Sequence, residues 1–137
     1  MTQEHDIRLA YISTLLDGGY TRLLEGTENP TIGYIVGGVT EPTTMNLHTG
    51  KLKEVSVLTI AEFEEFKELW NKYAMQAPLY TDHDVHRLTG VGTWVHDGKI
   101  YFDLVQHFHG FDEATEQAKQ RGEIAIYDCK NQKDLLL

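Results

Sequence analysis

The chain has 137 residues, of which 41% are hydrophobic, 24% charged and 10% aromatic, and this composition argues against a disordered, fibrous or coiled-coil protein. Its 21 acidic and 12 basic side chains give a formal charge of −9, so we expect no direct binding of nucleic acid, which needs clustered Lys and Arg. A membrane span and a secretory signal are not expected either, because no apolar run reaches ~18 residues and residues 1–6 are polar. Together with a single cysteine, Cys129, these features favour a cytoplasmic protein.

An amphipathic helix is predicted over residues 3–16, and the glycine pair at 18–19 is suited to end it. Its apolar side chains recur at the spacing of one buried helical face: Ile7, Ala10, Tyr11, Thr14 and Leu15.

Short strands are predicted next, at 20–24, 32–39 and 55–58. Residues 40–50, rich in Thr, Pro and Asn, are expected to form a loop between the last two. The doublet Gly37-Gly38 at the end of the second strand indicates a bulge or a close approach of the backbone.

A second helix, over residues 60–76, has a well-marked start. Thr59 and Glu62 fit a capping box, and Leu58 and Phe63 fit a hydrophobic staple. An aromatic stripe continues along the face expected in the core: Phe63, Phe66, Trp70 and Tyr73. The opposite face carries three acidic side chains: Glu64, Glu65 and Glu68.

A β-hairpin is predicted at about 90–108, because Asp97-Gly98 is a strong signal for a two-residue turn. That turn sets the register and places Trp94 opposite Tyr101. One face of the hairpin then suits the core: Val91, Thr93, Val95, Ile100, Phe102 and Leu104. The other face holds Trp94, His96, Lys99, Tyr101, Asp103 and His107.

A third helix over 112–121, starting at Asp112, and a strand over 123–128 complete the predicted elements. The apolar tail at 135–137 is expected to dock on the domain or on a partner. The order of elements predicts a single α+β domain of residues 1–137, an antiparallel sheet packed by helices near 3–16, 60–76 and 112–121.

Four segments resemble a group of small uncharacterised proteins associated with actinobacteria and their phages or mobile elements: 33–38 (GYIVGG), 92–103 (GTWVHDGKIYFD), 113–114 (EA) and 124–128 (IAIYD). The resemblance covers most of residues 7–128 and is closest in the hairpin and the last strand. It implies no particular activity and no site residues. It implies a mobile-element context, in which small acidic proteins often inhibit host defence enzymes.

The outer hairpin face is the first candidate site, because Trp94 and Tyr101 would lie side by side on a face away from the core. Exposed Trp and Tyr pairs are typical of protein-binding hot spots, although a second packing layer would explain them equally well. Acidic side chains would complete a partner-binding surface for a basic host protein. This predicted surface comprises Trp94, Tyr101, Asp103, Glu64, Glu65 and Glu68.

Histidines provide an alternative candidate, since imidazole with carboxylate suits zinc or iron. The ligands in this interpretation would be His83, His86, His107 and His109. Catalysis by Cys129, or by a pair of Asp103 and His96, is a further alternative, but no recognised catalytic motif accompanies these residues.

The leading hypothesis is a non-catalytic acidic binding protein without a cofactor. In its most specific form it inhibits a host defence enzyme, as an anti-CRISPR protein does, by occupying a basic nucleic-acid-binding site. The two other hypotheses are a small-ligand or metal-binding protein, with or without enzyme activity, and a homo-oligomeric structural module such as a homodimer.

Overall fold

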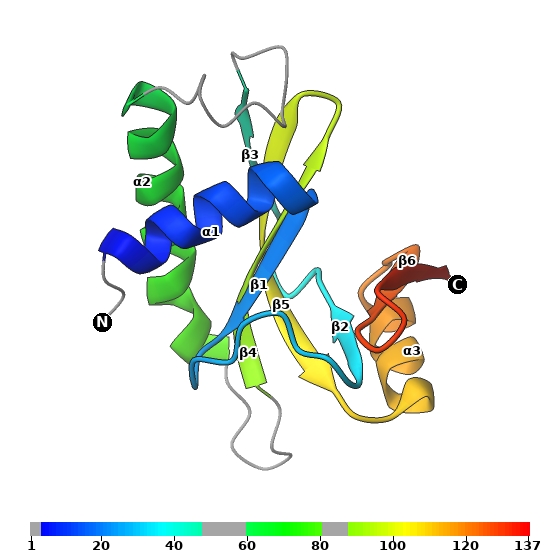
Figure 1. Cartoon of the computed structure of the whole chain (residues 1–137). Coiled ribbons are helices and arrows are strands. Elements are labelled where there is room, and N and C mark those ends of the chain that lie inside the picture. The colour runs from blue at the N-terminus through cyan, green and yellow to red at the C-terminus, as the bar shows by residue number, and fades with distance from the viewer. Residues whose placement is uncertain (1–3, 48–59, 81–87) are drawn as a thin grey trace.

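One antiparallel sheet organises the part of the chain that the computed structural model describes, which is residues 4–47, 60–80 and 88–137. In these residues the sheet has seven strands, six of them in the order β1-β4-β5-β2-β6-β7 (Figure 1). The seventh, β3, pairs with β5 as β2 does, but at the other end of β5. The strands are β1 (Gly19–Leu23), β2 (Tyr34–Val36), β3 (Thr43–Asn46), β4 (Leu88–His96), β5 (Lys99–Phe108), β6 (Ala125–Asp128) and β7 (Lys133–Leu136). The helices are α1 (Glu4–Asp17), α2 (Ile60–Gln76) and α3 (Phe111–Gln120), with a 3-10 turn η2 (Ala77–Tyr80). The predicted α+β class is therefore confirmed.

The β4–β5 hairpin has the register that the sequence predicts. Asp97 and Gly98 form its turn with φ values of 50° and 71°, and Trp94 lies opposite Tyr101. Two positive φ angles in succession match a type I′ turn, whose twist fits the twist of the flanking strands. The two turn residues were sufficient to predict this register, because the turn fixes every cross-strand pair that follows it.

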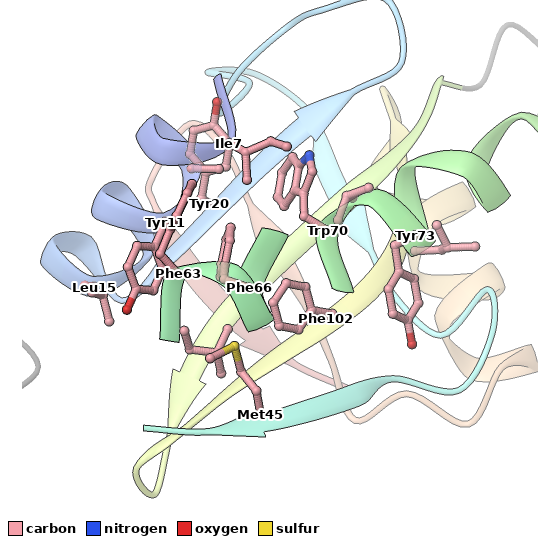
Figure 2. Packing of buried hydrophobic residues seen from close by; sticks show 14 of the residues in the cluster. Ile7, Tyr11, Leu15, Tyr20, Met45, Phe63, Phe66, Trp70, Tyr73 and Phe102 are labelled. Atoms are coloured by element: carbon pink, nitrogen blue, oxygen red, sulfur yellow. The ribbon is translucent and has the colours of Figure 1, made fainter. Parts of the chain in front are cut away.

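The main core lies between this hairpin and the first two helices. All five α1 residues predicted to face the core are buried, as is the aromatic stripe of α2. Figure 2 shows Phe66 between Tyr11 and Phe102, and its ring centroid lies 5.0 Å from each of theirs. Burying one such aromatic side chain contributes ~2 kcal/mol, so this stripe anchors α2 to the sheet.

A polar contact also joins the two helices. The Tyr11 hydroxyl donates a hydrogen bond to Glu62 Oε2 at 3.1 Å, and Glu62 is only 1% exposed. The predicted capping partner Thr59, the staple residue Leu58 and the strand predicted at 55–58 lie outside the described residues.

The third helix packs on the same sheet face, further along β5. Ala114 and Ala118 of α3 contact Phe108, which follows Phe102 and Leu104 in the alternation along β5. In Figure 1, α1 and α2 lie together beside the hairpin, and α3 lies beside β2 and β6 near the C-terminus. The sequence predicts a start at Asp112, but α3 begins at Phe111 after Gly110, which makes no side-chain cap.

Three segments differ from the sequence prediction. Residues 43–46, expected in a loop, form β3, and the tail at 133–136 forms β7. Both strands are short. β3 is held by the distant strand β5, which no local pattern reveals, whereas β7 forms a hairpin with β6, the strand that directly precedes it. The strand predicted at 32–39 is shorter and ends at Val36. In the described part of the chain, no helix is long and apolar enough to cross a membrane.

Candidate functional site

An aromatic pair marks the turn end of the hairpin, on the sheet face opposite the helices. The rings of Trp94 and Tyr101 are stacked, with centroids 5.1 Å apart and planes 8° from parallel. Trp94 is 37% exposed and Tyr101 is half-buried. A stacked pair contributes about 0.5–1.5 kcal/mol beyond its buried area, so the two rings present a preformed apolar surface.

A glycine of β1 leaves one flank of this aromatic pair open. Cross-strand pairing puts Gly19 of β1 beside Trp94 and Thr44 of β3 beside Tyr101, in one row across the sheet. Gly92, two residues before Trp94 on the same face, is buried, and the Val105 side chain fills the space where a Cβ would stand. Because Gly19 has no side chain, an approaching group can reach the flank of the Trp94 ring on the β1 side.

Much of this sheet face beyond the aromatic pair is covered. Val105 packs with Ile35 and Cys129 in a small buried cluster. Beyond it, His107 Nε2 lies 2.7 Å from the carbonyl oxygen of Ile32, in the segment that leads into β2. Farther along this face, the Tyr127 ring of β6, which is paired with Ile35, is 37% exposed, so exposed aromatic surface is not limited to the hairpin end.

Asp103 belongs to this face but does not reach its surface. Its side chain is only 2% exposed, whereas the strand pattern predicted it among the partner-binding residues. Alternation along a strand shows which face a residue takes, but not whether another segment covers that face. Here the covering segment is the connection between β2 and β3, where the Gly38 N–H donates to Asp103 Oδ2 at 3.0 Å.

The surroundings of Asp103 favour its neutral form. Burial raises the pKa of this carboxyl to about 7, and the nearby Glu123 carboxylate adds to the rise, against the opposing effects of the Gly38 and Leu104 N–H groups and of Arg121. Its other oxygen, Oδ1, is buried and has no hydrogen-bond partner among the described residues. Sequence reasoning missed Glu123 and Arg121, and the Gly37-Gly38 doublet was the one signal of a close approach at this point.

The three glutamates of the predicted surface lie elsewhere. Glu64, Glu65 and Glu68 are exposed on α2, which covers the sheet face opposite the aromatic pair. Glu64 is partly neutralised by Lys67, whose ammonium lies 3.4 Å from Glu64 Oε2 and 3.6 Å from Glu4. The structure therefore does not join these glutamates and the aromatic pair in one continuous patch.

The candidate metal ligands are only partly described. His83 and His86 lie outside the described residues. His107 and His109 stack edge to face with ring centroids 5.0 Å apart, but His107 Nε2 must donate its proton to the Ile32 carbonyl, which can only accept. Among the described residues, no group of three His, Cys, Asp or Glu side chains could hold a metal ion. The zinc or iron site remains a prediction.

The two candidate catalytic arrangements have unfavourable geometry. Burial raises the pKa of the Cys129 thiol to about 11, with a contribution from Asp128, so the sulfur carries little thiolate at neutral pH. His96 Nε2 lies 3.2 Å from Asp97 at the exposed turn, whereas Asp103 is buried. His96 and Asp103 therefore do not form an accessible acid–base pair.

Comparisons with protein-family models, with curated proteins and with solved structures find no match to this chain.

Proposed function

We propose that this protein is a non-catalytic binding module that docks on a partner protein through the Trp94–Tyr101 pair. The observation that carries the proposal is the stacking of Trp94 on Tyr101, which holds two aromatic rings side by side and partly exposed at the hairpin end. Trp and Tyr are enriched among the residues that dominate binding energy, and rings held rigid in advance lose little entropy on binding.

The charge of the chain supports a partner with a basic surface. A net charge of −9 attracts such a surface over a range of about one Debye length, or ~10 Å at 0.1 M salt. Since Glu64, Glu65 and Glu68 lie on the helical side, their role in this proposal is to steer the encounter, while Trp94 and Tyr101 make the contact.

The sequence resemblance extends the proposal to a specific class of partner. In a mobile-element context, a host defence enzyme with a basic nucleic-acid-binding site would fit the charge. Binding there would compete with nucleic acid and weaken as salt is added. Full inhibitory activity after Glu64→Lys and Glu68→Lys together would contradict this extension.

Affinity capture with matched variants tests the binding module. The tagged chain, its Trp94→Ala and Tyr101→Ala variants and a Met75→Ala control are used as bait in lysate of the source organism. Met75 is 78% exposed on α2, so the control removes a large apolar side chain away from the hairpin. We expect one partner to be captured by the wild type and by Met75→Ala, and at least tenfold less by Trp94→Ala.

Two results would contradict the proposal. One is a partner retained equally by Trp94→Ala, provided that the variant is folded by circular dichroism. The other is a wild-type mass in solution at a multiple of 15.6 kDa that falls to 15.6 kDa in Trp94→Asp, which would assign the aromatic pair to self-association.

A further inference from the structure

A buried polar cluster holds the connection between β2 and β3 and has no part in the proposed binding surface. β2 and β3 both pair with β5, so together they behave as one strand that is interrupted at residues 37–42. Val36 pairs with Gln106 and Thr43 with Phe102, which leaves six residues of the connection opposite three of β5, 103–105. At this interruption the Asp103 side chain, in place of a strand carbonyl, accepts the Gly38 N–H.

The connection approaches Asp103 as closely as a glycine allows. A Cβ atom on Gly37 would overlap Asp103 Oδ2 and would lie 3.2 Å from Glu123 Oε1. A Cβ on Gly38, where φ is +76°, would lie 2.9 Å from the Glu123 carboxyl carbon. The backbone at 37–38 is therefore enclosed by two carboxyl groups, one from β5 and one from the segment after α3.

In the described part of the chain, two charged side chains act on Asp103: the carboxylate of Glu123 and one cation, the guanidinium of Arg121. Arg121 Nη1 donates to the Gly37 carbonyl at 3.2 Å, and Nη2 donates to Gln106 Oε1. β4 places Gly92 opposite Asp103, and residues 37–38 offer only backbone, while the acidic side chain of the same connection, Glu41, is exposed and is not among the groups that act on Asp103. Whether this cluster holds together is thus decided by the protonation of Asp103, beside the Glu123 carboxyl group and the fixed charge of one arginine.

We propose that Asp103 and Glu123 form a pH-sensitive carboxyl clasp, which holds the β2–β3 connection against β5 while Asp103 is protonated and loosens when Asp103 ionises. A neutral Asp103 avoids repulsion from Glu123 and avoids a buried, unpartnered carboxylate oxygen. An ionised Asp103 brings both costs, and the simplest relief is to move the connection away and admit water. This inference does not depend on the proposed binding function.

The expected size of the effect follows from linkage. A carboxyl that titrates near 7 when closed and near ~4 when open loses about tenfold in its closing equilibrium between pH 6 and pH 8. The Gly38 amide reports closing directly, because its hydrogen bond to Asp103 exists only in the closed form.

Amide exchange measured by NMR tests the clasp in the full chain. After correction for the intrinsic pH dependence of exchange, we expect the protection of Gly38 in the wild type to fall about tenfold from pH 6 to pH 8. In Asp103→Asn, which stays neutral, protection should not change with pH. In Glu123→Gln the titration midpoint of the Gly38 amide shift should move to lower pH, because a neighbouring negative charge is lost. Asp112→Asn, an exposed control on α3, should behave as the wild type does.

Either of two outcomes would overturn the clasp. The first is equal protection of Gly38 at pH 6 and pH 8 in the wild type. The second is a wild-type pH dependence that persists in Asp103→Asn. If Asp103→Asn does not fold, an unchanged midpoint in Glu123→Gln overturns the clasp in its place.

Discussion

At the scale of one residue, the buried carboxyl of Asp103 leads to a prediction about the stability of the fold. The pKa of Asp103 is raised to about 7 in the folded protein and is ~3.9 in the unfolded chain. The contribution of Asp103 to the free energy of unfolding is therefore fully present below pH ~4 and is lost as the pH rises to 7. Asp103→Asn keeps an acceptor for the Gly38 N–H without the charge. We therefore expect Asp103→Asn to unfold at higher urea than the wild type at pH 8, with a gain of about 1–3 kcal/mol, and to differ little at pH 4.5. A lower urea midpoint for Asp103→Asn at pH 8 would show that the ionised carboxyl stabilises the fold.

The β4–β5 hairpin provides a test at the scale of one element, because its turn requires two left-handed residues. Gly98 has φ of 71°, where a Cβ costs about 1–2 kcal/mol whatever space surrounds it. Gly98→Ala should lower the free energy of unfolding by about 1 kcal/mol, measured by urea denaturation. Gly98→Asn is the matched control at the same position, since asparagine tolerates left-handed backbone better than alanine does, so its stability should change by less than half as much. Equal losses in the two variants would exclude turn strain as the cause.

The separation of the acidic helix α2 from the aromatic pair leads to a prediction for the whole molecule. Charges away from the contact act on the rate of encounter, whereas buried anchors act on dissociation. With a captured partner, Glu64→Lys together with Glu68→Lys should slow association several-fold and weaken its salt dependence while the dissociation rate is unchanged. Trp94→Ala should instead raise the dissociation rate at least tenfold. Surface plasmon resonance at two salt concentrations distinguishes these effects, and faster dissociation in the charge-reversal variant would place the α2 glutamates inside the contact.

Features that depend on neighbours in the sequence were predicted well. The faces of α1 and α2 follow from a 3.6-residue period, and the hairpin register follows from Asp97-Gly98. The strand β3 was missed because its four residues depend on a partner strand far away in the chain. The strand β7 was missed because its four residues follow β6 through a turn, residues 129–132, that has no Asn-Gly or Asp-Gly signal. The same distinction between local and non-local features applies to the candidate site. The Trp94–Tyr101 pairing was predicted from the turn, but the burial of Asp103 was not.

The sequence by itself determined the α+β class, the three helices, and the two aromatic residues that stand opposite each other on one hairpin face. These follow from periodicity and turn chemistry, which act over a few residues. Only the tertiary structure decided which parts of that face stay open. The connection at residues 37–42 and the segment after α3 close over Asp103, while Gly19, which has no side chain, leaves Trp94 accessible from the β1 side. Burial, and with it the pKa of a carboxyl or the exposure of a ring, depends on segments that are distant in sequence and meet only in the folded chain.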